Sequence, residues 1–260
     1  CPFIPRYFGS FLTENDFDGQ TRVSIVEEHV PGGDLGRWID EGALTASSAA
    51  DVAGGGTGDG QAGGSDDAGQ EARGEQQRER PEGVPTVLPP PPPEEWLARV
   101  CRDTLEALRH LHARRCIHRD VKPANILLHV SGGAKLADFG SSVGDEEGES
   151  ARRMHGTIRF MSPERLWAKQ CSPSSDLWSA GLTVAAAALG ENPIPHCTTE
   201  FEAVGHAEAA FETVRAHPTA ALLSDALMDF LKAVLIAEPD QRPTVEKMLQ
   251  HRFVSQVAEV

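Results

Sequence analysis

The sequence lacks the features that mark secreted and membrane proteins. Its longest apolar run, residues 182–189, is far shorter than the ~20 residues of a membrane-spanning helix. The N-terminus has no basic stretch followed by an apolar core, so it does not resemble a signal peptide. The five cysteines form no Cys-x-x-Cys pair and are odd in number, which favours free thiols in a reducing compartment. We therefore expect a cytoplasmic protein without membrane contact, with the nucleus as the alternative.

Basic charge is also scarce. The chain has 24 Lys and Arg against 39 Asp and Glu, for a formal net charge of -15. This balance argues against nucleic acid or an anionic membrane as a partner. Five histidines show no metal-ligand spacing and are interpreted as ordinary core or surface residues: His110, His112, His155, His196 and His206. A hydrophobic fraction of 40% over 260 residues is nevertheless enough for a sizeable core.

Residues 42–93 differ in composition from the rest of the chain. They are rich in small, acidic and amide residues and end in the proline run Pro89 to Pro93. Such a segment buries too little apolar surface to offset its ordering entropy, which predicts a disordered insert with a polyproline II end. It is either a tolerated expansion of a surface loop or a docking site for a polyproline-binding domain. The insert divides the chain into residues 1–41, 42–93 and 94–260.

The flanking segments predict short strands followed by many helices. Strand-like patterns cover residues 7–12, 21–29, 126–129 and 135–137, the last two joined by a glycine turn. Asp34 is placed to cap a short helix to Ile39. Helical patterns cover residues 94–114, 176–189, 200–216, 224–236 and 244–251. Two small strand pairs ahead of a helical C-terminal half indicate an α+β fold.

One loop carries three chemically complementary side chains. The run from His118 to Asn125, HRDVKPAN, lies between a predicted helix and a predicted strand. Phosphoryl transfer depends on positioned charge more than on covalent help from the protein. A carboxylate such as Asp120 can orient a hydroxyl and accept its proton, an amide such as Asn125 can hold magnesium, and Lys122 can offset phosphate charge. The loop therefore predicts phosphoryl transfer.

A second motif follows the next predicted strand. In Asp138-Phe139-Gly140, the aspartate can bind a magnesium ion that bridges ATP phosphates. Phe139 can pack into the core, and Gly140 permits a sharp turn. The tripeptide alone is a weak signal. The ordered set, with Met161-Ser162-Pro163-Glu164 and Arg242 after it, is specific.

With these motifs the chain resembles a eukaryotic protein kinase, from the fourth strand of the small lobe to the end of the large lobe. The resemblance implies a protein kinase-like α+β fold with an incomplete small β lobe and a helical large lobe. Residues 1–41 would be the partial small lobe, hinge and first large-lobe helix, 42–93 the insert, and 94–260 the large lobe. ATP and Mg²⁺ are the implied cofactors. A lysine two positions after the catalytic aspartate is the pattern of serine/threonine kinases.

The resemblance also assigns roles to individual residues. Asp120 matches the catalytic base, Lys122 the phosphate-contacting lysine, and Asn125 and Asp138 the metal ligands. Glu28 and Val30 resemble the hinge residues whose backbone binds adenine, and Leu127 resembles the floor beneath it. A further set matches structural positions: His118, Phe139, Gly140, Glu164, Asp176 and Arg242. In that set Glu164 is expected to pair with Arg242, and Asp176 to brace the catalytic loop.

Finer similarity points to a subgroup. Residues 6–11, 28–35 and 156–166 are similar to mitogen-activated protein kinase kinases, which phosphorylate a threonine and a tyrosine in the next kinase. Other members of the sterile-type group share much of this pattern. The implied partners are a protein substrate, such as a downstream kinase, and an upstream activating kinase.

Several departures favour a rival interpretation. No glycine-rich loop, strand lysine or helix glutamate precedes Tyr7, although a complete kinase has all three. Glu27 falls at the back of the adenine pocket, where a buried charge is costly. The chain would then be a truncated kinase or pseudokinase that acts as a binding scaffold.

The activation segment carries the regulatory candidates. Arg119 matches an arginine that meets a phosphate on this segment in related kinases, and Ser150 is the candidate acceptor. The alternatives are that Ser150 is an ordinary loop serine, or that the acidic residues 145–149 imitate a phosphate. Thr157, by resemblance, hydrogen-bonds near Asp120 and shapes the substrate site.

Overall fold

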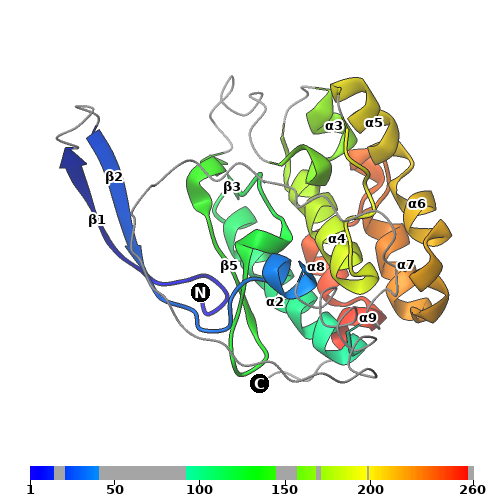
Figure 1. Ribbon diagram of the computed structural model, residues 1–260, viewed down its shortest axis with the longest axis horizontal. Coiled ribbons are helices and arrows are strands. Elements are labelled where there is room, and N and C mark those ends of the chain that lie inside the picture. The colour runs from blue at the N-terminus through cyan, green and yellow to red at the C-terminus, as the bar shows by residue number, and fades with distance from the viewer. Residues whose placement is uncertain (15–20, 41–91, 145–156, 168–170, 198, 257–260) are drawn as a thin grey trace, which may run out of the picture.

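The computed structural model describes residues 1–14, 21–40, 92–144, 157–167, 171–197 and 199–256. The predicted insert, except for its last two prolines, and the candidate acceptor Ser150 lie outside the described residues. In Figure 1 the labelled helices pack into one lobe, and the hairpin of β1 (Tyr7–Glu14) and β2 (Thr21–Glu27) lies apart from them, beyond the edge of this lobe.

In the hairpin, β1 and β2 pair antiparallel. Tyr7 lies opposite Glu27 at the base of the hairpin, and a register shift follows between Tyr7 and Gly9. The chain then enters a helical segment at residues 35–40. Asp34 begins this segment as expected, because its carboxylate accepts a hydrogen bond from the Arg37 amide at 2.8 Å.

Helix α2 (Glu94–His112) runs through the core, as Figure 1 shows. Two acidic residues open it, which complements the positive end of the helix dipole. The apolar residues that recur at helical spacing are all buried: Leu97, Cys101, Leu105, Leu108 and Leu111. The helix predicted for residues 94–114 is thereby confirmed, with its end two residues earlier.

Two short strand pairs carry the loops of interest. In one, β4 (Ile126–Leu128) pairs with β5 (Ala134–Leu136). In the other, β3 (Cys116–Ile117) pairs with β6 (Val143–Gly144). The pair β3–β6 was not predicted, because a two-residue strand carries no periodic signal. The 3₁₀ turns η1 (Pro123–Asn125) and η2 (Phe139–Ser141) lie at the same end of these pairs.

The remaining described elements are helical. They are η4 (Ile158–Phe160), α3 (Pro163–Leu166), α4 (Pro173–Leu189), α5 (Glu200–Glu208), α6 (Ala210–Ala216), η5 (Pro218–Leu222), α7 (Asp225–Val234), η6 (Pro239–Gln241), α8 (Val245–Leu249) and α9 (Arg252–Ser255). The α+β class is confirmed. The helix predicted for residues 200–216 is instead two helices that meet at Ala209, and the one predicted for residues 244–251 is shorter.

Helix α4 is buried from Ser175 to its last residue, Leu189. A capping box between Ser172 and Ser175 starts it, and Gly190 in the left-handed region (φ 80°) ends it. Gly181 allows α7 to approach closely, because a Cβ there would lie 2.4 Å from a methyl carbon of Val234. The alanine run 185–188 is buried, as expected for a close-packed helix face. Among the described helices, none is long and apolar enough to cross a bilayer.

Trp96 and Trp167 are expected from their large apolar side chains to be packing residues, but they behave differently in the structure. Trp96 packs against the core and lies 4.9 Å from the Trp38 ring between centroids. Trp167 is 51% exposed, so its expected packing role was wrong. The reason is that α3 has only four residues, all buried, and Trp167 is the first residue beyond them.

Candidate active site

Asp176 holds the backbone of the loop that precedes Asp120. Its carboxylate is 1% exposed and accepts hydrogen bonds from the amides of His118 at 2.9 Å and Arg119 at 2.8 Å. Burial acts to raise the pKa of Asp176, but the hydrogen bond and charge of His112, together with the hydrogen bond from the His118 amide, outweigh it, so the pKa lies below its ordinary value. A charged side chain in the buried helix α4 therefore fixes this loop.

The third partner of Asp176 was missed by sequence reasoning. His112, the last residue of α2, lies 2.9 Å from Asp176 through its Nε2 atom. Since 64 positions separate the two residues, no local spacing could have indicated the contact. The carboxylate thereby ties α2, α4 and the loop together.

The side chain of Asp120 is surrounded by donors. Its Oδ1 accepts a hydrogen bond from the Thr157 amide at 2.9 Å, while its Oδ2 lies 3.1 Å from the Lys122 Nζ. The Asn125 Nδ2 also donates to Oδ2 at 3.2 Å and to the Asp120 carbonyl at 2.7 Å. Burial acts to raise the pKa of Asp120, but the Thr157 amide and the Lys122 ammonium outweigh it and hold the pKa below its usual range. The carboxylate is therefore an anion that can accept a proton.

Lys122 connects the loop to the segment at Thr157. Its Nζ donates to the Thr157 Oγ1 at 2.9 Å while it pairs with Asp120. Only 21% of the Lys122 side chain is exposed, so its charge is partly shielded from water. The structure thus brings Asp120, Lys122, Asn125 and Thr157 into one hydrogen-bonded group.

The strand pair β4–β5 brings Asp138 beside this group. The Asn125 carbonyl accepts a hydrogen bond from the Ala137 amide at 2.9 Å, and Asp138 is the next residue. Asp138 is exposed, has a left-handed backbone (φ 63°) and accepts a hydrogen bond from the Gly140 amide at 3.3 Å. Residues other than glycine rarely adopt this conformation, and they often do so where function requires it.

His118 links the two motifs through its ring. Its Nε2 donates to the Ala137 carbonyl at 3.0 Å, and its Nδ1 accepts from the Asp120 amide at 3.3 Å. Burial lowers the pKa of His118, which matches this neutral tautomer. The Phe139 ring packs edge-on against the imidazole at 5.1 Å between centroids. This packing fixes the start of the Asp138-Phe139-Gly140 motif against the loop.

The donor set suits magnesium held jointly with phosphate. Because Asn125 uses its amide nitrogen on Asp120, its amide oxygen is left to face a metal, and Asp138 adds carboxylate oxygens. Oxygens of this kind are the ligands that Mg²⁺ prefers. Within the described part of the chain, no three His, Cys, Asp or Glu side chains cluster as a metal site. A magnesium ion held by Asn125 and Asp138 would take its further ligands from phosphate oxygens or water.

Arg119 faces the beginning of the activation segment. It is 5% exposed, and its Nε donates to the Ser141 carbonyl at 2.5 Å. Arg165 donates to the Arg119 carbonyl from the other side. The regulatory arginine of the prediction is therefore positioned next to the segment that carries Ser150, which itself lies beyond the described residues.

Below the site, Glu164 and Arg242 form a buried bidentate pair, with both contacts at 2.7 Å. Ser175 donates to Glu164, and the Arg242 guanidinium lies 4.8 Å above the Trp178 ring. These contacts attach the short helix α3, which follows the activation segment, to the C-terminal helices.

The hinge candidates border the same region. Val30 is buried, and the next segment docks on β4 because the Leu128 amide donates to the Gly33 carbonyl at 2.8 Å. Leu127 forms a β-bridge with Asp34. Glu27 is exposed, so the expected burial of its charge was wrong. Its position as the last residue of β2, opposite Tyr7, leaves the side chain in solvent.

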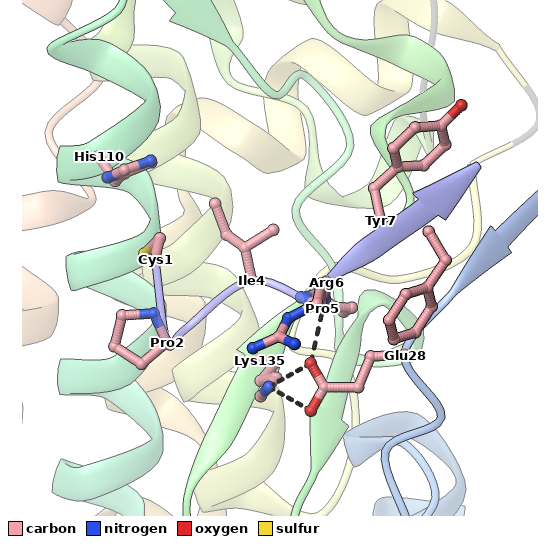
Figure 2. Close-up of a pocket in the computed structure, with 10 residues that line it drawn as sticks. Cys1, Pro2, Ile4, Pro5, Arg6, Tyr7, Glu28, His110 and Lys135 are labelled. Carbon is pink, nitrogen blue, oxygen red and sulfur yellow. Dashed lines mark hydrogen bonds and ion pairs between the residues drawn. The ribbon is translucent and has the colours of Figure 1, made fainter.

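A pocket of about 710 Å³ lies beside the hinge. Figure 2 shows it between the N-terminal segment, α2 and β5, with Arg6, Glu28 and Lys135 meeting at its wall. None of the loop residues Asp120, Lys122 and Asn125 lines it. This pocket is therefore distinct from the group around Asp120.

Comparison with known proteins identifies the family. Residues 91–254 match the protein kinase domain. The chain belongs to the protein kinase family. A mitogen-activated protein kinase kinase 5 of Leishmania mexicana is 39% identical over 178 residues, covering 64% of this chain and 32% of that protein.

Two further relatives carry related names. The serine/threonine-protein kinase STE20 of Candida glabrata is 35% identical over 164 residues, covering 63% of this chain and 18% of that protein. A mitogen-activated protein kinase kinase 3 of Arabidopsis thaliana is 33% identical over 165 residues, covering 63% of this chain and 31% of that protein. The chain therefore spans about a third or less of these relatives.

Proposed function

We propose that this chain is the catalytic part of a serine/threonine kinase that transfers the γ-phosphate of ATP to a hydroxyl of another protein. The observation that carries the proposal is the convergence of Thr157, Lys122 and Asn125 on the Asp120 carboxylate. Membership of the protein kinase family supports it. The names of two relatives favour a mitogen-activated protein kinase kinase whose substrate is a downstream kinase.

In this proposal Asp120 is the general base. Its carboxylate accepts the proton of the acceptor hydroxyl, and the hydroxyl oxygen attacks the terminal phosphorus. The bond from this phosphorus to the β,γ-bridging oxygen of ATP breaks, and ADP leaves. Lys122 offsets charge on the transferred phosphoryl group, and its bond to the Thr157 hydroxyl fixes the substrate-facing segment. Asn125 and Asp138 would hold magnesium, which would neutralise phosphate charge when bound. The backbones of Glu28 and Val30 would bind adenine, and Leu127 would lie beneath it.

The proposal includes the domain boundaries and the regulatory residues predicted from the sequence. Residues 1–41 contribute small-lobe and hinge elements, 42–93 form an insert, and 94–260 form the large lobe. Arg119 would meet a phosphate on the activation segment, with Ser150 as its site and an upstream kinase as its donor.

The test separates an enzyme from a scaffold. The full-length protein and its Asp120→Ala variant are compared for Mg-ATP binding by thermal shift, and for transfer of labelled phosphate to a generic protein substrate. We expect both proteins to bind, and transfer by the variant to fall at least ~100-fold. Binding without transfer by the unmodified protein would favour the scaffold, and equal transfer by both would refute the role of Asp120.

A further inference from the structure

Three hydrogen bonds converge on the carboxylate of Glu28. Lys135 Nζ lies 2.7 Å from each of its two oxygens, and the Arg6 amide donates to Oε2 at 3.0 Å (Figure 2). In return, the Glu28 amide donates to the Arg6 carbonyl at 2.7 Å. Arg6 and Glu28 flank the base of the β1–β2 hairpin, so their reciprocal bonds close it, and Lys135 attaches it to β5.

This attachment joins parts that share no strand pairing. Strands β1 and β2 form one sheet, and β4 and β5 form another. The neighbouring residue of β5 makes a second link, because the Leu136 amide donates to the Phe3 carbonyl at 2.9 Å. Two adjacent β5 residues therefore hold the segments on either side of the hairpin, and Asp138 follows two positions later.

The ion pair of Lys135 and Glu28 is less exposed to solvent than an isolated surface pair. Only 17% of the Lys135 side chain and 36% of the Glu28 side chain are exposed. The hydrogen bond with Lys135, followed by that of the Arg6 amide, lowers the pKa of Glu28 below its ordinary value. Because two donor groups make three hydrogen bonds to one carboxylate, the geometry is fixed more firmly than in a single exposed pair.

We propose that Lys135 is a positioning residue, whose ion pair with Glu28 sets the hinge at the distance from Asp138 that a nucleotide must span. This inference rests on the proposed function, in which adenine lies at the hinge and magnesium-phosphate at Asp138. A site whose two ends are already held in place binds its ligand more tightly, because less conformational entropy is lost when the ligand binds. Lys135 itself touches no reacting atom.

The test compares Lys135→Met, Lys135→Arg and the control Lys232→Met, which alters an exposed lysine of α7. Amide hydrogen exchange is measured in the full-length protein. We expect Lys135→Met to speed exchange at Arg6, Glu28 and Leu136 while α7 keeps its protection. Lys135→Arg, which retains the cation, should behave like the unmodified protein. Unchanged exchange in Lys135→Met would overturn the inference.

Nucleotide binding provides the functional readout. Lys135→Met should weaken Mg-ADP affinity and raise the KM for ATP about fivefold, within the range of a partly exposed ion pair, while kcat stays nearly constant. Faster exchange with unchanged affinity would overturn the positioning role, as would the absence of nucleotide binding by the unmodified protein. If the unmodified protein binds Mg-ADP but transfers no phosphate, only the proposed function fails, because exchange and affinity still decide the role of Lys135.

Discussion

Glu164 and Arg242 lie 78 positions apart in the sequence and form a bidentate ion pair with both contacts at 2.7 Å. The Arg242 side chain is fully buried and that of Glu164 is 4% exposed. Arg242 also donates to the carbonyls of Ser174, Ile236 and Ala237, so its donors are extensively satisfied. One guanidinium therefore holds α3, the start of α4 and the chain after α7 together.

Breaking this pair should destabilise the protein strongly. Glu164→Ala leaves a buried guanidinium without its counter-charge, so we expect a loss of about 3–5 kcal/mol in the free energy of unfolding. Urea denaturation gives the measurement. Glu212→Ala is the matched control, because Glu212 forms an exposed pair with Arg215 within α6 and should lose less than about 1 kcal/mol. Equal losses in the two variants would contradict the structural role of Glu164.

The pKa of Asp176 predicts an acid-dependent stability. Its folded-state pKa lies below the ordinary value of 3.8, so the unfolded chain binds protons more readily. Stability from this group is therefore complete well above pH 3.8, begins to fall near that value, and is lost as the pH falls through the lower folded-state pKa. Asp176→Asn should be less stable at neutral pH and lose less stability on acidification. The urea unfolding midpoints of both proteins are measured between about pH 6 and pH 3. If the two midpoints fall equally with pH, Asp176 does not cause the acid dependence.

The lowered pKa of Asp120 predicts that kcat/KM falls on the acid side only well below neutral pH. Because this carboxylate is charged well below neutral pH, kcat/KM should show no loss from its protonation between about pH 6 and pH 8. Lys122→Met removes a nearby cation, so it should lower the rate and shift the acid limb to higher pH. If Lys122→Met lowers the rate but leaves the acid limb at the same pH, then Lys122 does not lower the pKa of Asp120.

The two ends of the predicted insert are close in space. Trp38 and Trp96 lie on either side of it, and their ring centroids are 4.9 Å apart. A short glycine-serine linker in place of residues 42–91 should therefore close the chain and keep the melting temperature within about 5 °C, because closure entropy varies slowly with loop length. Loss of folding would show that the segment is part of the structure. Loss of partner binding in a pull-down with a polyproline-binding domain would favour its docking role.

Local motifs predicted the parts of the site that are continuous in sequence. The loop from His118 to Asn125 and the triplet at Asp138 were found because their residue types and spacing are constrained within a few positions. The exposed Trp167 was misjudged, because burial at the end of a short helix depends on tertiary packing.

The contacts of His112 and Lys135 could not be predicted in this way. Their partners Asp176 and Glu28 are 64 and 107 positions away, and only the folded chain brings them together. Likewise, the exposure of Glu27 depends on where β2 ends, and strand ends are weakly encoded in sequence.

The most direct test of the account is a crystal structure of the full-length protein with Mg²⁺ and a non-hydrolysable ATP analogue. We predict one magnesium ion that is bound by both the Asn125 amide oxygen and an Asp138 oxygen at ~2.1 Å and by phosphate oxygens. The Asp120 carboxylate should face the terminal phosphoryl group from the side of Thr157. A nucleotide bound elsewhere, or a metal that contacts neither Asn125 nor Asp138, would contradict the central claim.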